Sequence, residues 1–324
     1  MEDKPEFSTP FHHLTVLRRE VVEGLAPHPG GIYVDGTLGG GGHSEALLER
    51  APGITLVGID HDPAALAAAK ARLAARVEQG GGTLHLVHGS FGDLRHHLDS
   101  LGIVSIDGLV VDLGVSSYQL DTAERGFSFM REGPLDMRMD PTTGPSAADL
   151  VNTLPQEELA RVLWEFGEER ESRRIAAAIV MDRRKVPFTT TTQLASLLER
   201  LLRKGGARDR IHPATRTFQA LRIAVNGELD QLDALLPAAV DALKVGGRLA
   251  VISFHSLEDR RVKQFVRKGT HPCICPPDFP VCGCGRVASL IDLTRKVIEA
   301  GEDEVAANPR SRSARLRITQ RAEG

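Results

Sequence analysis

The sequence predicts an α/β protein whose doubly wound, Rossmann-like parallel sheet is interrupted by an all-helical insertion. Short apolar runs alternate with helix-like segments in the first third of the 324-residue chain, and this alternation returns after residue 216. Between residues 122 and 216 no segment is typical of a strand. An alternating βαβα order implies parallel strands with helices on both faces of the sheet.

Four apolar runs are the predicted strands of the first part of the sheet. They span residues 31–35, 54–59, 83–87 and 106–111. A helix is predicted over 44–50, and another begins at Pro63, a residue favoured in the first helical turn. Apolar residues then recur at helical spacing, at Leu66, Ala69, Leu73 and Val77.

The insertion begins with a loop rich in Gly, Pro and Met over residues 133–145. Four helices are predicted in it, over 147–151, 156–164, 168–184 and 191–204. After the insertion we expect a helix over 218–243 that is broken near Pro237, a strand over 246–254 and a second helix over 257–267. The segments 293–298 and 314–319 are expected to close the sheet as an antiparallel strand pair. The expected domains are therefore a discontinuous one, 1–121 with 217–324, and the insertion, 122–216.

The composition is typical of a cytoplasmic enzyme. No apolar run approaches the ~20 residues that a membrane helix needs, and the polar residues 1–13 lack the apolar core of a signal peptide. The net charge is −3, so any nucleic-acid binding must depend on local basic patches. Two such patches, residues 200–222 and 310–321, favour contacts with phosphates, although charge clusters are often only solvated faces.

A glycine run, Gly39 to Gly42, follows the first predicted strand and precedes a helix, as expected of a ligand-binding loop. No register of the run gives the Gly-x-Gly-x-x-Gly pattern that binds a pyrophosphate. Asp35, just before the loop, would repel a phosphate but would suit a cationic sulfonium and an α-amino group. Both groups belong to S-adenosyl-L-methionine, and the alternative is a flexible loop without a ligand.

Three carboxylates end neighbouring predicted strands and are expected to face one crevice. They are Asp35, Asp60 and Asp112. Asp60 lies 21 residues after Gly39, where a carboxylate can accept both ribose hydroxyls. Phe91, after the third strand, could pack on the adenine, or it could be a core aromatic. The alternative for each aspartate is that it caps the turn or helix that follows.

Eight strings spread over nearly the whole chain resemble one family, the bacterial 16S rRNA (cytosine-N4)-methyltransferases of the RsmH or MraW type. The strings are His13–Leu17, Asp35–Ser44, Asp112–Ser117, Glu124–Met130, Pro134–Asp140, His212–Ala220, Ser253–Arg260 and Asn308–Arg317. The resemblance implies a class I methyltransferase sheet and methylation of a cytosine in the decoding region (P site) of 16S rRNA. It also implies the assembled small ribosomal subunit as substrate, and an insertion that recognises RNA.

By motif match, the resemblance places cofactor contacts at Gly41, Gly42, His43, Asp60, Phe91, Asp112 and Gln119. The chain departs from many members at Tyr118 and Ser90, where proline is common. These departures leave the shape of both loops open. The oligomeric state is open as well, with a dimer as one expectation.

The exocyclic amine of cytosine is a poor nucleophile, so the site must accept hydrogen bonds from it and let a proton leave. Asp112, Ser116 and Ser117 are the predicted acceptors, because no Pro-Pro-aromatic string follows the fourth strand. His255, just past the fifth strand, is the next candidate, although a lone histidine is more often structural. Tyr118 or Phe254 could stack on the target base.

Three rival functions stay open at this stage. The chain could methylate another nucleic acid or an amine, reduce a substrate with a nicotinamide cofactor, or assist ribosome assembly without catalysis. The absent pyrophosphate pattern argues against the reductase, and the three strand-end aspartates argue against a factor without a catalytic site.

Cys273, Cys275, Cys282 and Cys284 are the four cysteines of the chain. Four thiolates can hold a tetrahedral zinc, but C-x-C spacing is less typical than C-x-x-C. Members of the resembled family can lack these cysteines, so the shared chemistry needs no metal. The sequence alone therefore leaves a structural zinc site open, and we do not include a metal among the predicted site groups.

Overall fold

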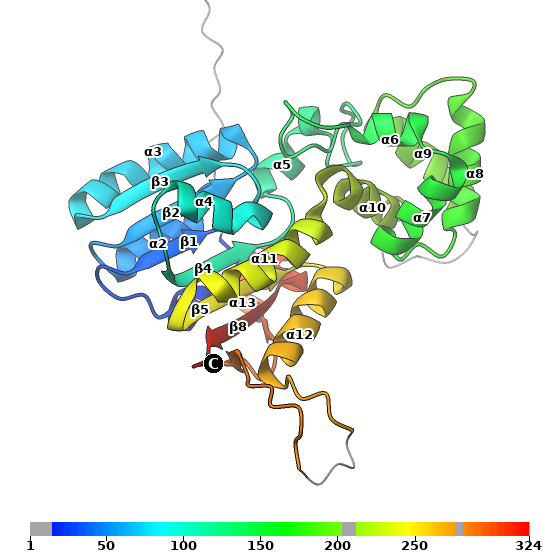
Figure 1. Ribbon diagram of the computed structural model, residues 1–324. Coiled ribbons are helices and arrows are strands. Elements are labelled where there is room, and N and C mark those ends of the chain that lie inside the picture. The colour runs from blue at the N-terminus through cyan, green and yellow to red at the C-terminus, as the bar shows by residue number, and fades with distance from the viewer. Residues whose placement is uncertain (1–14, 203–211, 277–280, 324) are drawn as a thin grey trace, which may run out of the picture.

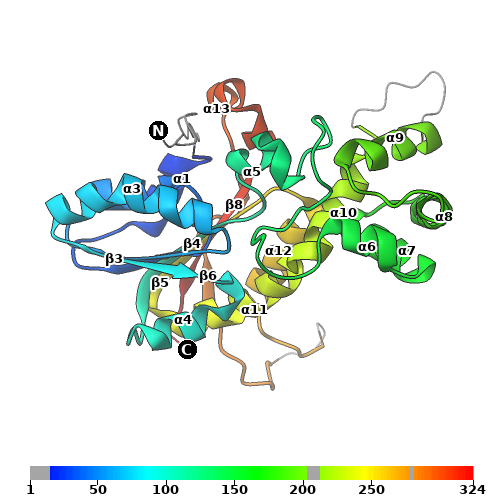
Figure 2. The same ribbon diagram turned by 90° about the horizontal axis from the view of Figure 1, so that it is seen from above.

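The fold consists of an open sheet covered by helices, with a group of helices extending from one end of it (Figures 1 and 2). The structure is a computed structural model and describes residues 15–202, 212–276 and 281–323. Some residues discussed above lie outside these ranges. They are residues 1–13, the first two residues of the string His13–Leu17, and the predicted helical residues 203 and 204.

The sheet has the strand order β3-β2-β1-β4-β5-β8-β6, and β7 pairs with β8. The strands are β1 (Ile32–Asp35), β2 (Thr55–Asp60), β3 (Thr83–His88), β4 (Ile106–Asp112), β5 (Leu243–Ser253), β6 (Leu290–Asp292), β7 (Ile298–Glu299) and β8 (Arg315–Arg321). Strands β1 to β5 pair in parallel, and β8 is antiparallel to β5, β6 and β7. The predicted fold class is confirmed.

Two apolar cores lie on opposite faces of this sheet. Consecutive strand residues alternate between faces, so Val110 belongs to one core and Val111 to the other. The first face is covered by α1 (Arg18–Leu25), α2 (Gly42–Arg50) and α3 (Pro63–Gly80). The second is covered by α4 (Leu94–Ser100), α11 (Glu228–Ala242) and α12 (Ser256–Thr270). Strands buried on both faces explain why the sequence runs are apolar without alternation.

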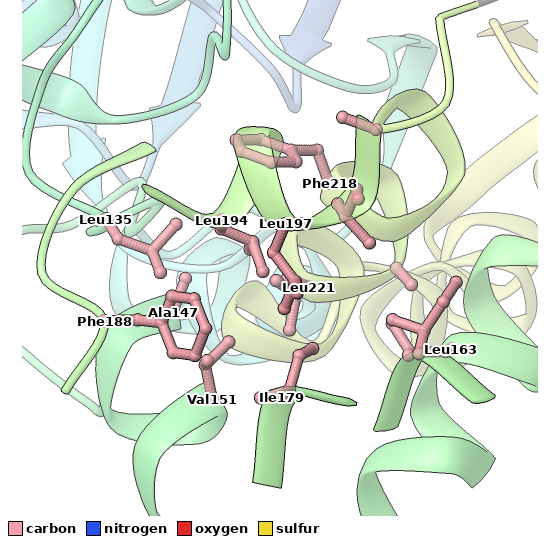
Figure 3. Packing of buried hydrophobic residues seen from close by; sticks show 14 of the residues in the cluster. Leu135, Ala147, Val151, Leu163, Ile179, Phe188, Leu194, Leu197, Phe218 and Leu221 are labelled. Carbon is pink, nitrogen blue, oxygen red and sulfur yellow. The ribbon is translucent and has the colours of Figure 1, made fainter. Parts of the chain in front are cut away.

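The helices beyond the sheet enclose a core of their own. They are α6 (Ala147–Thr153), α7 (Gln156–Gly167), α8 (Ser172–Arg183), α9 (Thr191–Leu202) and α10 (Thr215–Asn226). Figure 3 shows Leu163, Ile179, Leu194 and Leu221 converging in this core. Between β4 and this group stand α5 (Ser117–Asp121) and the 3-10 helix η2 (Ala123–Arg125). The expected domain boundary between residues 216 and 217 falls inside α10, whose Phe218 packs into the helical core.

The remaining elements are short. They are the 3-10 helices η1 (Phe91–Asp93) and η3 (Pro309–Ser313) and the helix α13 (Glu302–Ala307). Among the described residues, no helix combines the length and the apolar character that crossing a bilayer requires.

Two predicted elements were wrong. The break in the predicted helix 218–243 occurs at Gly227, not Pro237, because Gly227 adopts a left-handed φ of 61° that ends α10 and precedes α11. In the predicted strand 293–298, residues 293–297 form a turn between β6 and β7, and only Ile298 lies in a strand, as the first residue of β7, which pairs antiparallel with β8. In this turn, Asp292 Oδ1 accepts the amides of Thr294 and Arg295, at 3.0 and 3.2 Å. The antiparallel strand expected over 314–319 is confirmed as β8.

Candidate cofactor and active site

A cavity of about 550 Å³ opens at the carboxyl ends of the parallel strands, where the strand order reverses between β1 and β4. Small-molecule sites measure roughly 300–1,000 Å³ and favour this position in doubly wound sheets. Residues from the segments after all five parallel strands line it, together with residues within 15–16, 222–232 and 308–313.

The glycine loop between β1 and α2 forms one wall. Gly39 and Gly41 have left-handed φ values of 49° and 78°, and the Gly41 amide donates to the Leu38 carbonyl at 2.8 Å. A Cβ on Gly42 would lie 1.9 Å from Thr15 Oγ1, so a larger residue there would displace Thr15. Gly42 lines the cavity together with Gly39, whereas Gly41 shapes the turn behind it.

Asp35 does not line the cavity. It is buried at the end of β1, where its carboxylate accepts the Ser44 hydroxyl at 2.7 Å and the Thr37 amide at 3.3 Å. Burial raises the pKa of Asp35 despite these hydrogen bonds. The structure therefore places Asp35 as an anchor between β1 and α2, behind the wall that faces the cavity.

Asp60 lines the cavity at the end of β2. Its two carboxylate oxygens accept the backbone amides of Gly39, at 2.7 Å, and of Asp62, at 2.8 Å. Burial raises the pKa of Asp60 to about 6, although both amide hydrogen bonds act in the opposite direction. Each oxygen keeps a further lone pair for a hydroxyl donor, and the carboxylate also ties the glycine loop to β2.

His43 and Asp112 face each other across the cavity wall. His43 Nε2 lies 3.6 Å from Asp112 Oδ2. Both ring nitrogens of His43 and the Oδ1 atom of Asp112 are buried without a hydrogen-bond partner in the described parts of the chain. Buried polar atoms are nearly always satisfied in native proteins, so unsatisfied ones in a cavity indicate a ligand.

Ser116, Ser117 and Gln119 also line the cavity, at the start of α5. Ser116 and Gln119 form a reciprocal capping box, in which each side chain accepts the other residue's backbone amide. Gln119 Nε2 donates to Asp62 Oδ2 at 3.2 Å, and Asp62 is paired with Arg125. Much of the hydrogen-bonding capacity of Gln119 therefore fixes the loop after β4.

Two aromatic side chains line the cavity, Phe91 at the start of η1 and Phe254 after β5. Ser90, which stands where proline is common in the family, caps η1 by accepting the Gly92 amide at 3.0 Å. Tyr118 lies on α5 and does not line the cavity.

His255 does not reach the cavity either. It is the N-cap of α12, and its Nδ1 accepts the Glu258 amide at 3.4 Å. Glu258, which the sequence reasoning missed, lines the cavity and lies 3.0 Å from His255 Nε2. The His255 imidazole and the Arg222 guanidinium help to keep the pKa of Glu258 low despite its burial. Its position three residues after a helix N-cap, within the string Ser253–Arg260, could have indicated it.

A buried ion pair, also missed by the sequence analysis, contributes to the cavity wall. Arg222 donates two hydrogen bonds to Glu228, both at 2.8 Å, and both residues line the cavity. Arg222 belongs to the first predicted basic patch, but its charge is used inside the protein.

Most described arginines of the second basic patch also have protein partners. Arg310 pairs with Asp121 at 2.6 Å, and Arg315 and Arg317 both pair with Asp259. Arg312 is exposed and lines the cavity rim. The core of the first patch, residues 203–211, lies outside the described residues.

Comparison with known proteins decides the family. The profile of the MraW methylase family matches residues 10–322. The chain belongs to this family. The resemblance drawn from the eight strings is thereby confirmed, and the chain is a methyltransferase that uses S-adenosylmethionine.

Relatives of this MraW-family chain carry the name ribosomal RNA small subunit methyltransferase H. The protein of Trichlorobacter lovleyi is 55% identical over 96% of this chain and 98% of its own length. The protein of Heliobacterium mobile is 51% identical over 96% and 99%. A crystal structure of a putative rRNA methylase from Clostridium thermocellum covers 95% of this chain and all of its own, at 11% identity and a TM-score of 0.43, too distant to support an argument.

Proposed function

We propose that this MraW-family chain transfers a methyl group from S-adenosylmethionine to the exocyclic N4 of a cytosine in the decoding region of 16S rRNA, on the assembled small subunit. The observation that carries the proposal is the unsatisfied pair His43 and Asp112 inside a strand-end cavity, in a chain whose relatives are named rRNA small subunit methyltransferases.

The cavity residues fit the cofactor. The Asp60 carboxylate would accept the ribose hydroxyls, and the apolar faces of Phe91 and Leu232 would border the adenine. Asp112 and His43 offer unsatisfied polar atoms for the charged amino acid end of the cofactor. When bound, S-adenosylmethionine supplies a methyl group on a cationic sulfur. Asp35 takes no direct part in this proposal, since Ser44 and Thr37 occupy its carboxylate.

The chemistry on the cytosine side requires an acceptor for the amine hydrogens. Glu258 and Asp112 are carboxylates that line the same cavity. A carboxylate that accepts an N–H of the amine draws its lone pair out of conjugation and can receive the proton after attack. We assign this role to Glu258 or Asp112, with Ser116 and Ser117 shaping the entrance and Phe254 as an apolar surface for the base.

The helical insertion is proposed as the RNA-recognition part of the chain. Together with α10 it extends away from the sheet (Figure 2). Met139 and Arg222 line the cavity directly. A cytosine must leave its stack to enter such a cavity, so the surface around the entrance has to hold the flanking strand. The exposed Arg312 at the rim can contact a phosphate.

The test is mass spectrometry of nucleosides from small ribosomal subunits incubated with the protein and S-adenosylmethionine. N4-methylcytidine is expected at one position of 16S rRNA, with little product on naked rRNA. Product on naked DNA or a protein amine instead would refute the substrate. The Asp99→Asn variant, an exposed carboxylate on α4, is the control for Asp112→Ala, which should lose the product.

A further inference from the structure

The loop between α12 and β6 is closed at its base, and its described residues form no apolar core. The Ser289 amide donates to the Gly269 carbonyl at 3.0 Å. Between residues 271 and 289, none of the residues that the structure describes is buried, and Ile274, Val281 and Val287 are exposed by 65%, 75% and 66%. The loop projects from the body of the molecule (Figure 1). Hydrophobic burial among the described residues therefore does not hold the two arms of the loop together.

Four cysteine sulfur atoms, two from each arm, converge in this loop. The Sγ atom of Cys282 lies 3.5 Å from that of Cys273, 3.9 Å from that of Cys275 and 3.4 Å from that of Cys284. The Sγ atoms of Cys273 and Cys284 are 3.9 Å apart. All four sulfurs lie within 4.8 Å of one another.

This arrangement matches a tetrahedral thiolate site. With zinc–sulfur bonds of about 2.3 Å, the sulfurs at the corners of a tetrahedron are about 3.8 Å apart. Two disulfides would instead give each sulfur one close partner, whereas Cys282 has three near neighbours at similar distances. The Gly283 amide also donates to Cys275 Sγ at 3.3 Å, a contact that stabilises negative charge on a ligating sulfur.

We propose that Cys273, Cys275, Cys282 and Cys284 bind one zinc ion that fixes the projecting loop. Sulfur ligands in a tetrahedron favour zinc or iron. None of the four cysteines lines the cavity, so the metal would have a structural role. We assign zinc because a structural metal needs no change of oxidation state. The site lies outside the methyl-transfer machinery and adds a metal that the sequence alone did not predict.

The first test is metal analysis of the full-length protein purified without added metal. We expect about one zinc per chain, and loss of zinc in Cys282→Ser and in Cys284→Ser. His271→Ala is the matched control, because His271 is a potential ligand in the same loop but hydrogen-bonds to Thr270 and lies outside the cluster. Zinc retained by the cysteine variants, iron in place of zinc, or two disulfides in the native protein would overturn the proposal.

A second test uses the wild-type chain and is independent of how the variants fold. Cobalt replacing the zinc should give the intense visible absorption of a tetrahedral thiolate site. A chelator should then speed tryptic cleavage at the exposed Arg286, while thermal unfolding of the sheet, whose cores contain no residue of this loop, stays unchanged. Absence of the absorption, or cleavage at an unchanged rate, would contradict a metal clamp.

Discussion

At the residue scale, the cavity depends on a few polar groups that the fold leaves ready for a ligand. Leaving a buried acceptor without a hydrogen bond costs roughly 1–3 kcal/mol. The Oδ1 atom of Asp112 and the ring of His43 bear such a cost in the free protein. A ligand that satisfies them recovers that energy as affinity, which explains why the cost is tolerated.

Replacing Asp112 with asparagine tests this explanation. The substitution keeps the shape but removes the charge beside His43, so we expect methyl transfer on small subunits to fall by about 100-fold in kcat/KM, in line with the loss of one positioned polar group. Thermal stability should stay within about 1 kcal/mol of wild type, since asparagine has nearly the same shape and keeps the contact with His43. Activity within a factor of three of wild type would remove Asp112 from the site.

The raised pKa of Asp60 predicts that cofactor binding depends on pH. Its pKa of about 6 means that it is ionised above that pH and protonated below it. Because ribose hydroxyls donate to the ionised form, affinity for S-adenosylhomocysteine should be level above about pH 7, fall as the pH passes through about 6, and drop by up to tenfold per unit below that. Calorimetry across this range measures the effect. Asp60→Asn should flatten the profile, while Asp99→Asn, which changes an exposed carboxylate on α4, should retain it.

The positions of the strand-end aspartates could be predicted from the sequence, but the directions of their side chains could not. Asp35 shares a face of β1 with Tyr33, and α2 covers that face. The Ser44 hydroxyl on α2 therefore donates a hydrogen bond to the Asp35 carboxylate, which we expected to face the cavity. Similarly, the choice between His255 and Glu258 depends on the N-cap geometry of α12, which places Glu258 inward.

At the element scale, one buried ion pair connects the insertion to the sheet. Arg125, in η2, pairs with Asp62 at 2.5 Å and also donates to the carbonyls of Arg138 and Met139. Met139 lines the cavity. The pair therefore positions the loop that leads into the helical group against the cofactor side of the cavity.

Removing Arg125 should therefore destabilise the chain. Arg125→Ala leaves Asp62 buried without its cation, which costs about 3–5 kcal/mol in comparable pairs. Arg161→Ala removes an exposed pair with Glu165 on α7 and should cost less than about 0.5 kcal/mol. Chemical unfolding of both variants gives the comparison. Equal losses would show that the Arg125 contacts contribute nothing special.

Secondary structure was predictable where local pattern and fold agree. The five parallel strands were found because each is an apolar run ending at a turn or a polar residue. The break at Gly227 was missed because Pro237 is the stronger local signal, and the left-handed φ of Gly227 becomes visible only in the structure. The short β6 was missed and β7 was predicted only at Ile298, because the Asp292 turn divides an otherwise strand-like segment.

At the scale of the whole molecule, the proposed function requires a weakly acidic protein to bind a polyanion. The net charge of the chain is −3, and most described arginines of the two basic patches form ion pairs with carboxylates of the protein. The described residues of these patches therefore form no broad cationic surface. Binding should therefore depend on a few exposed cations near the cavity and on shape.

Arg312 is the cation that best tests this. Arg312→Ala should raise the KM for small subunits by roughly tenfold without changing the affinity for the cofactor. The slope of the logarithm of the binding constant against the logarithm of the salt concentration should fall by about one, because one phosphate contact is lost. Lys268→Ala, at the far end of α12, is the control. Equal effects of the two substitutions would indicate a diffuse electrostatic attraction rather than a contact at the rim.

The most direct test is an equilibrium titration of the free protein with S-adenosylmethionine and, separately, with NAD. The cavity described here predicts one saturable site for S-adenosylmethionine, clearly weakened by Asp112→Asn, and no measurable uptake of NAD. Preference for the pyrophosphate-bearing nucleotide, or methyl-donor binding that is indifferent to Asp112, would contradict the assignment of this cavity.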